Sequence, residues 1–152
     1  MLAVASATPE DLFLPSPVPV HALDGSAVQA WVARTLPLDT NDAEGTMLAL
    51  CELIGKTVVY QRRSEKGVQS PARTLALKSG SCRDMATLML EAARHLGVAA
   101  RFSSGYLHSS ASRAGRGTTH AWTEVYLPTL GWRGFDPTVG GSISLDHIVV
   151  GV

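Results

Sequence analysis

The sequence predicts an α+β protein, with helices in roughly its first two thirds and antiparallel strands in its last third. Between residues 82 and 96 apolar side chains recur every three or four positions, the spacing of one face of a helix. Between residues 118 and 127 the two faces of an extended chain differ in character, which is typical of a strand. A tight turn at 128–131 and a further strand ending at Asp136 complete an antiparallel hairpin.

The chain of 152 residues fits one domain that is long enough to bury a proper core. Its 13 basic and 13 acidic side chains cancel, which gives no sign of a surface for nucleic acid or anionic membranes. No apolar run approaches the about 20 residues of a membrane span. Two cysteines do not make a disulfide scaffold, and Pro9, Glu10 and Asp11 interrupt any signal-peptide pattern. We therefore expect a cytoplasmic protein.

The N-terminal half contains the first helices. Residues 1–20 include four prolines and predict an extended lead-in, so that residues 21–152 form the single domain. Helices are expected from about residue 24 or 26 to 36, from 41 to about 59, and from Pro71 to about 78, after Ser70 as N-cap. Cys51 lies within the apolar stripe of the second helix, where it is most simply a core residue. The polar, basic stretch 61–69 predicts a surface loop.

Cys82 stands in the first turn of the helix that begins the most regular apolar pattern. Gly80 breaks the preceding element and Ser81 can cap the helix. The free backbone N–H groups and the helix dipole at this end favour a negative charge, so a thiolate is stabilised there. Taken alone, a core cysteine is the commoner role for such a residue. Asp84 caps this helix or orients the site.

The hairpin brings His120 and Asp136 together. Antiparallel strands pair by a constant sum of residue numbers, and the turn near 129–130 makes that sum roughly 256–260, so the two residues are near neighbours. A carboxylate beside an imidazole fixes its tautomer and stabilises the protonated form. If the start of the Cys82 helix packs against the hairpin, the three side chains form a nucleophile, a base and an orienting group. Considered singly, His120 is more simply a solvent-facing histidine and Asp136 a turn residue before proline.

Several linked blocks resemble the transglutaminase-like superfamily, in particular its bacterial branch of cysteine-protease-like proteins. The resemblance covers about residues 70–140. The matching blocks, in order, are Gly-Ser-Cys-Arg-Asp at 80–84, Ala-Arg at 100–101, Ser-Gly-Tyr at 104–106, His-Ala-Trp-Thr-Glu-Val-Tyr at 120–126 and Gly-Trp-Arg-Gly-Phe-Asp-Pro-Thr at 131–138.

This resemblance implies a papain-like, transglutaminase-core fold in which the nucleophile helix packs on an antiparallel β-sheet. It also implies that Cys82 is the nucleophile, His120 the base and Asp136 the third member of a triad. No cofactor is expected. The calcium sites of animal transglutaminases have no visible counterpart, and no Cys or His pair has the spacing of zinc ligands.

The chain departs from the family pattern in three places. Residues 85–87 read Met-Ala-Thr instead of the more usual Phe-Ala-His, which affects packing beside the site more than the chemistry. The upstream β domain that members of the branch often carry does not fit into the first 20 residues. The apolar ending 147–152 is interpreted either as a pairing strand or as the edge of an excised domain.

Substrate-binding side chains are harder to assign. Tyr106, Trp122 and Ser104 are candidates, with Trp122 alternatively part of the core between sheet and helix. Tyr60 is a candidate for the second oxyanion donor, after the backbone N–H of Cys82. The remaining histidines show no partner pattern: His21, His95, His108 and His147.

The predicted function is a thiol hydrolase, either a cysteine protease or an amidase, acting through a thioester acyl-enzyme. Its expected partner is a peptide or protein substrate, with neither nucleic acid nor membrane, and the oligomeric state is not indicated. Because loop 108–117 is short and polar and no second domain is expected to roof the site, hydrolysis is expected to dominate over transfer to an amine. The alternatives are a protein transamidase and a non-catalytic peptide-binding module of the same fold.

Overall fold

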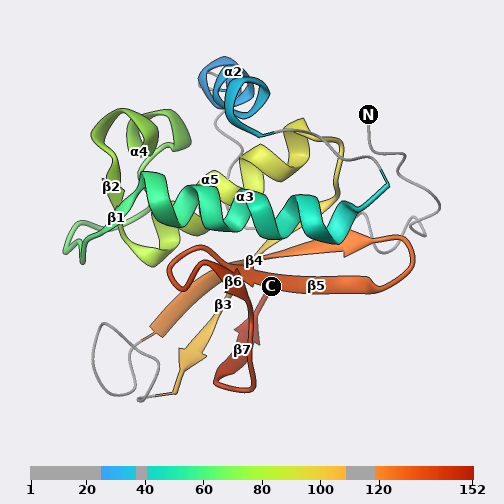
Figure 1. Cartoon of the computed structure of the whole chain (residues 1–152). Helices are drawn as coiled ribbons and strands as arrows, with labels where there is room; N and C mark the ends of the chain where they lie inside the picture. The colour runs from blue at the N-terminus through green and yellow to red at the C-terminus, as the bar shows by residue number, and fades with distance from the viewer. Residues whose placement is uncertain (1–24, 37–40, 109–118) are drawn as a thin grey trace.

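The computed structural model describes residues 25–36, 41–108 and 119–152. Within them, helices cover one side of a five-stranded antiparallel sheet, as Figure 1 shows. The α+β prediction is confirmed. The lead-in expected at 1–20, and loop 108–117 apart from His108, lie outside the described residues.

The helices follow the predicted order. They are α2 (Gly25–Thr35), α3 (Ala43–Thr57), α4 (Pro71–Leu77) and α5 (Cys82–His95). Asp42 caps α3 by accepting a hydrogen bond from the Gly45 backbone N–H at 2.8 Å, and Ser70 caps α4 in the same manner. None of the helices in the described part of the chain is long and apolar enough to cross a membrane.

The main sheet has the strand order β6-β5-β4-β3-β7. Its strands are β3 (Ala100–Leu107), β4 (Thr119–Leu127), β5 (Gly131–Asp136), β6 (Gly141–Ser142) and β7 (His147–Gly151). The β4–β5 register runs from Leu127↔Gly131 to Thr123↔Phe135, so the pairing sum is 258, inside the expected range. The C-terminal segment is a pairing strand, because β7 lies antiparallel to β3 at the edge of the sheet.

Helix α5 is the centre of the packing. Nearly all of its residues from Cys82 to Ala93 are buried, because it is covered by other helices and lies against β4. On the β4 side the Thr123 hydroxyl donates to the Ala86 carbonyl at 2.7 Å, which fixes the helix on the strand. The position of the helix that carries the candidate nucleophile is therefore fixed relative to the sheet.

A short parallel pair precedes α5. Strands β1 (Val59–Tyr60) and β2 (Ser79–Gly80) pair at Tyr60↔Gly80, so the segment that follows β1 starts beside the segment that leads into α5. The stretch 61–69 was expected to be a surface loop, and this is only partly correct. Gln69 is buried, because its side chain bonds to α4 and β2.

Candidate active site

Cys82 is the first residue of α5, as the sequence predicts. It is 8% exposed, and its side chain packs with those of Ala86 and Ala121, the latter near the start of β4. The first backbone N–H groups of a helix have no partner within the helix. The Cys82 thiol therefore lies next to free N–H groups and the positive end of a helix dipole.

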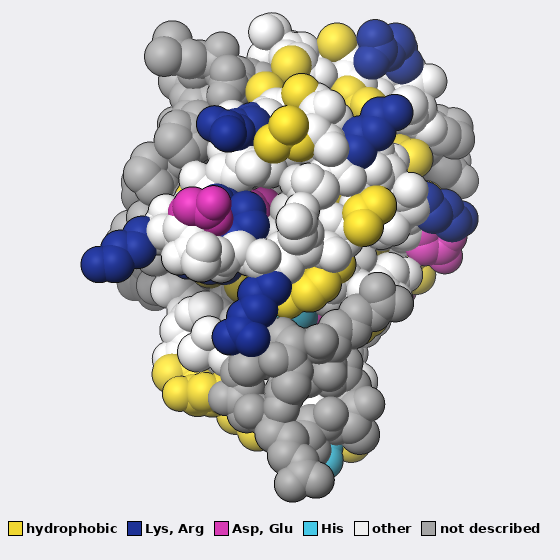
Figure 2. Space-filling view, turned by 90° about the vertical axis from the view of Figure 1, so that its left-hand side faces the viewer, with side chains coloured by type: hydrophobic (Ala, Val, Ile, Leu, Met, Phe, Trp, Pro, Cys, Tyr) yellow, Lys and Arg dark blue, Asp and Glu magenta, His cyan; other side chains and the backbone are white. Residues whose placement is uncertain are grey.

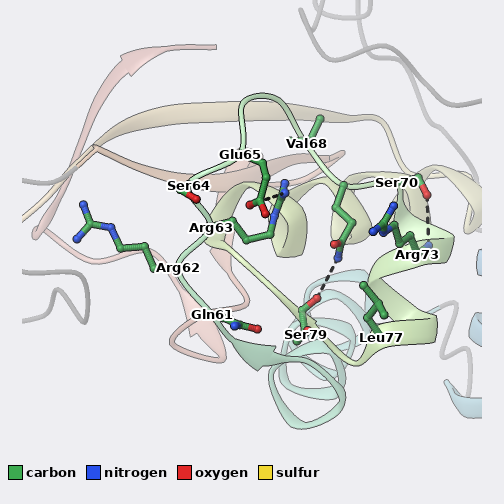
Figure 3. Close-up of a pocket in the computed structure, with 11 residues that line it drawn as sticks. Gln61, Arg62, Arg63, Ser64, Glu65, Val68, Ser70, Arg73, Leu77 and Ser79 are labelled. Atoms are coloured by element: carbon green, nitrogen blue, oxygen red, sulfur yellow. Dashed lines mark hydrogen bonds and ion pairs between the residues drawn. The ribbon is translucent and has the colours of Figure 1, made fainter.

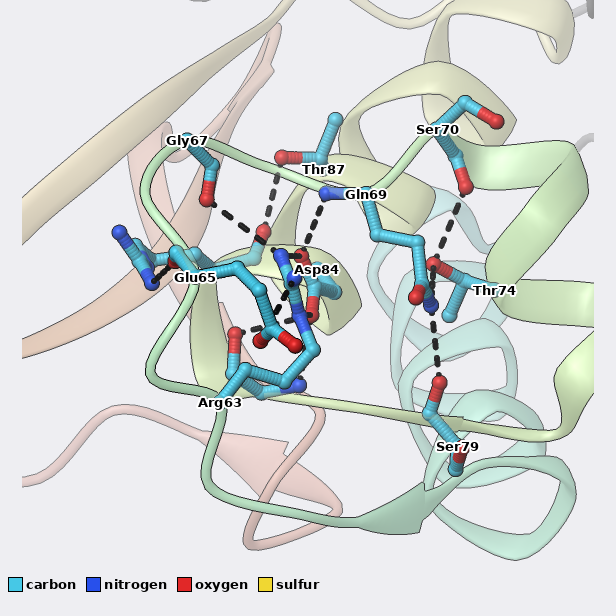
Figure 4. A network of polar contacts seen from close by, with 11 residues as sticks. Arg63, Glu65, Gly67, Gln69, Ser70, Thr74, Ser79, Asp84 and Thr87 are labelled. Carbon is cyan, nitrogen blue, oxygen red and sulfur yellow. Dashed lines mark hydrogen bonds and ion pairs between the residues drawn. The ribbon is translucent and has the colours of Figure 1, made fainter.

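A buried carboxylate holds this helix start in place. Asp84 is fully buried and accepts hydrogen bonds from the backbone N–H of Ser81 at 2.8 Å and from that of Gln69 at 2.7 Å. The guanidinium of Arg63 forks onto the same carboxylate, with Nε at 2.6 Å from Oδ2 and Nη2 at 3.0 Å from Oδ1 (Figure 4). Burial alone would raise the pKa of Asp84, but these donors lower it below its ordinary value. The capping role is confirmed, and Arg63 is a partner that the sequence did not indicate.

His120 and Asp136 meet as expected from the hairpin. Nε2 of His120 lies 2.6 Å from Oδ2 of Asp136, and both side chains are buried. Asp136 stands opposite Trp122 by the register of the hairpin, so His120 is its diagonal neighbour on the same face. The Cys82 thiol lies beside the same imidazole, since both residues line one cleft and the thiol helps to raise the pKa of His120. The structure thus brings Cys82, His120 and Asp136 into one cluster.

The Asp136 carboxylate is saturated with donors. Oδ1 accepts from the backbone N–H of Thr138 at 2.9 Å and from its hydroxyl at 2.7 Å. Oδ2 faces Nε2 of His120 and, at 2.9 Å, Nε2 of His147. An ionised carboxylate offers about four acceptor positions, all of which are used here. Although burial by itself would raise the pKa of Asp136, these bonds hold it well below its ordinary value.

The protonated form of His120 is favoured. Burial on its own would lower the pKa of this imidazole. The hydrogen bonds to Asp136 and Cys82, together with the negative charges of both groups, outweigh burial and raise the pKa from 6.5 to about 9. An imidazolium is therefore the main form of His120 at neutral pH, as a thiolate–imidazolium pair requires.

Cys51 has a different environment from Cys82. It is fully buried in α3 and its thiol points to the Gly141 carbonyl at 3.5 Å. Burial raises the pKa of the Cys51 thiol strongly, and the nearby charge of Asp136 adds to the effect. A buried thiol of this kind is inert toward electrophiles, so the interpretation of Cys51 as a core residue is supported.

A cleft of about 500 Å³ opens above Cys82. Ser104 lies on its wall, as do Tyr60 and Phe102. Trp122 is fully buried and does not line the cleft, because its ring packs edge-on against His147 with centroids 5.2 Å apart. Tyr106 is 45% exposed on β3 and does not line it either. Among the described residues, those that line this cleft are Tyr60, Arg62, Arg63, Ser81, Cys82, Arg83, Phe102, Ser104, Thr119, His120 and Ala121.

A second hollow adjoins this cleft along residues 61–79 (Figure 3). The two share Arg62 and Arg63 as lining residues. Arg63 is turned toward Asp84 and Glu65, whereas the Arg62 side chain extends away from the other labelled residues in Figure 3. On the same side of the molecule, basic side chains outnumber acidic ones in Figure 2, and a histidine surface is visible in a narrow opening.

His120, Asp136 and His147 are also the one group in the described part of the chain whose ligand atoms are close enough to hold a metal ion. The sequence showed no partner for His147, and that interpretation is wrong. Ligand atoms around a tetrahedral zinc ion lie about 3.3 Å apart, since each bond is about 2.0–2.1 Å long. The contacts of 2.6 and 2.9 Å are shorter, and their lengths fit hydrogen bonds. The cluster as it stands fits two imidazole N–H groups that donate to a carboxylate better than it fits a metal site.

Comparison with known proteins identifies the family and agrees with the fold. Residues 29–137 match the sequence model of the transglutaminase-like superfamily, and the chain belongs to this superfamily. A relative from Mycobacterium leprae, named Uncharacterized protein ML0607, is 38% identical over 77 residues, which are 48% of this chain and 27% of the relative. Uncharacterized protein YebA of Bacillus subtilis is 33% identical over 73 residues, 41% of this chain and 10% of the relative. The chain thus matches only about a quarter or less of these relatives' length.

Solved structures share the fold. A candidate cysteine protease from Cytophaga hutchinsonii superposes with a TM-score of 0.67 at 22% identity, covering 90% of this chain and 45% of the other. The periplasmic domain of TgpA from Pseudomonas aeruginosa, bound to ethylmercury, gives a TM-score of 0.61 at 22% identity over 92% of this chain and 52% of that one. Both likenesses concern the fold alone.

Proposed function

We propose that this chain is a thiol hydrolase of the transglutaminase-like superfamily, which cleaves peptide or carboxamide bonds through a thioester acyl-enzyme. The observation that carries the proposal is that His120 bonds to Asp136 and shares the wall of one cleft with Cys82, which stands at the start of a helix. In this assignment Cys82 is the nucleophile, His120 the acid–base and Asp136 the group that orients the imidazole.

The reaction begins with attack of the Cys82 thiolate on the carbonyl carbon, which forms a C–S bond and places a negative charge on the carbonyl oxygen. His120, charged at neutral pH, gives its proton to the leaving nitrogen as the C–N bond breaks. The product is a thioester on Cys82 and a free amine. Water then attacks the thioester while neutral His120 takes its proton, which releases the acid and restores the thiolate–imidazolium pair.

The oxyanion needs donors at the start of α5. The backbone N–H of Cys82 is free by its position in the helix, and such a donor contributes about 3–4 kcal/mol to the transition state. The Tyr60 hydroxyl is the proposed second donor, since Tyr60 lines the cleft with Cys82. Burial, followed by the nearby charge of Cys82, raises the pKa of Tyr60 above 10.0, so its hydroxyl keeps the proton that it would donate.

Hydrolysis is proposed over transamidation because of the character of the cleft wall. Among the lining residues described, only Tyr60, Phe102 and Ala121 bring aromatic or aliphatic surface, and the others are polar, charged or the thiol itself. Transfer to an amine requires that water be kept away from the thioester, which needs an apolar enclosure.

We therefore expect that an activated acyl donor, offered together with a millimolar primary amine, yields mainly the acid formed by water and little of the amide formed by the amine. Mass spectrometry of both products, with Cys82→Ala as the blank for uncatalysed reaction, measures the partition. If the amide product exceeds the acid, the chain is a transamidase. If wild type and Cys82→Ala give the same products at the same rate, the chain is a binding module.

The charge of the cleft also predicts a substrate preference. Its described wall contains three guanidinium groups and no carboxylate, and Asp84 neutralises only that of Arg63. Arg62 is exposed, and Arg83 bonds to a backbone carbonyl rather than to an acid. Acidic groups flanking the scissile bond are therefore favoured, by about two- to fivefold in kcat/KM for one exposed pair.

The measurement compares two peptide amides that differ only by Glu or Gln next to the scissile bond. We expect the preference for Glu to shrink in Arg62→Gln and at high salt, because exposed charges are screened. Arg34→Gln, on the exposed side of α2, is the matched control and leaves the ratio unchanged. Equal kcat/KM for both peptides in wild type at low salt would refute the preference for acidic residues. It would leave the assignment of Cys82 as the nucleophile unchanged.

A further inference from the structure

His147 lies against the triad although it comes eleven residues after Asp136 in the chain and outside the segment matched by the family. Its side chain is 2% exposed, and Nε2 is 2.9 Å from Oδ2 of Asp136. Its ring centroid is 5.9 Å from that of His120. Two imidazoles therefore share one oxygen of a buried carboxylate.

The tautomer of His147 follows from its other nitrogen. The backbone N–H of Ser144 lies 3.1 Å from Nδ1 of His147 and donates to it. A backbone N–H can only donate, so Nδ1 must carry a lone pair. The proton of the neutral ring then sits on Nε2, where it points to Asp136. His147 is in this way set up as a neutral donor to the carboxylate.

The surrounding backbone keeps this ring in place. His147 is the first residue of β7 and pairs with Leu107 of β3, at the opposite end of this pairing from the register shift between Ser104 and Gly105. A Cβ atom at Gly105 would collide with the Ile148 carbonyl, so the close approach of β7 depends on this glycine. On the other side, the ring meets the indole of Trp122 edge-on at 5.2 Å.

We propose that His147 is a positioning residue of the active site, which donates from Nε2 to Asp136 and so keeps that carboxylate ionised and turned toward His120. The proposal rests on the assignment of Cys82, His120 and Asp136 as the catalytic groups. His147 does not touch the substrate cleft in the described residues and acts only through Asp136. Without it, Oδ2 has a single donor, and only the two bonds of Thr138 to Oδ1 still help to hold the carboxylate toward His120.

The sign of the electrostatic effect can be worked out from the groups that face Asp136. These are His120 from β4, His147 from β7, Thr138 after β5, Cys51 from α3 and, more distantly, Tyr60 from β1. Of these, His147 is a neutral donor that shares Oδ2 with His120. Without it the carboxylate is turned less firmly toward His120 and stabilises the imidazolium less, so His120 loses its proton at lower pH.

The test compares His147→Gln with His147→Leu and His147→Asn. The Gln amide nitrogen reaches about the position of Nε2, the Asn amide only that of Nδ1, and Leu has no donor. A hydrogen bond to a charged group accounts for a factor of about 10–100, so kcat should fall by that factor in the Leu and Asn variants with KM unchanged. His147→Gln should recover most of the loss. His95→Gln, at the far end of α5, is the control.

A readout without substrate separates this proposal from the proposed function. NMR titration of the His120 ring should give a lower midpoint in His147→Leu than in wild type, and a midpoint near that of wild type in His147→Gln. This holds even if no turnover is found. If Gln and Leu variants of equal melting temperature show the same titration and the same kcat, the donor has no role and the proposal fails. An unshifted titration in all three variants also overturns it.

Discussion

Asp136→Asn should reduce kcat by about 10⁴-fold, the size of effect that removal of the orienting carboxylate has in Ser–His–Asp enzymes. The Asn oxygen can serve the two donors of Thr138, which leaves its NH₂ group facing Nε2 of His120 and of His147. Because two donors cannot bond, His120 is driven to the tautomer with its proton on Nδ1. That nitrogen then cannot take the proton of the Cys82 thiol.

The same variant should change how stability depends on pH. In wild type the pKa of His120 is raised to about 9, so its stabilising contribution is complete below the unfolded value of 6.5 and is lost as the pH rises through about 9. The pKa of Asp136 is lowered, so its contribution is present above the unfolded value of 3.8 and is lost in more acidic solution. Urea unfolding across pH should give a flatter profile for Asp136→Asn.

Asp42→Asn, on the exposed N-cap of α3, is the matched control, since Asn caps a helix as well as Asp does. It should keep both the activity and the pH profile of wild type. An Asp136→Asn protein with nearly full kcat would exclude Asp136 from the triad.

Asp84→Ala should lower the free energy of unfolding by about 3–5 kcal/mol, because it leaves a partly buried cation without its partner. Arg63 is 18% exposed and bonds to Asp84 through two nitrogens. Two backbone N–H groups, those of Gln69 and Ser81, lose their acceptor as well. Since the Ser81 N–H immediately precedes Cys82, alkylation of the thiol should also become slower.

The control for this prediction is Glu65→Ala. Glu65 also pairs with Arg63, at 3.5 Å, but its side chain is 70% exposed, so the expected loss is at most about 1 kcal/mol. The double variant Asp84→Ala, Arg63→Met should be more stable than Asp84→Ala, because no unpaired charge remains. Chemical denaturation of the four proteins measures these differences, and equal losses for Asp84→Ala and Glu65→Ala would contradict the account.

Local patterns were enough to predict most of the fold. Helix α5 could be located because its apolar spacing begins directly after Gly80 and Ser81, and its observed bounds are Cys82–His95. The strand register of the hairpin could be predicted from residue numbers alone, because a tight turn fixes the sum of the paired positions, which is 258 in the structure. His120 and Asp136 were predicted neighbours for this reason, since they depend only on contacts close in the sequence.

The parts that were missed depend on long-range packing. Arg63 meets Asp84 because β1 pairs in parallel with β2, which no periodicity in the sequence indicates. His147 reaches Asp136 only through the pairing of β7 with β3. Trp122 points to the same face of β4 as His120. Its indole packs against the His147 ring there and does not line the cleft. One signal was available for His147, namely the apolar strand pattern that follows it.

The central claim is that Cys82 is a nucleophile activated by His120, and the rate of alkylation tests it most directly. Brief exposure to iodoacetamide near neutral pH, followed by peptide mapping, measures Cys82 and Cys51 in the same molecule. We expect that Cys82 reacts far faster than Cys51 and that His120→Ala removes this advantage. Wild type and variant should converge at about pH 10, well above the pKa of about 8.5 of a free thiol. Equal rates for the two cysteines, or an unchanged Cys82 rate in His120→Ala, would contradict it.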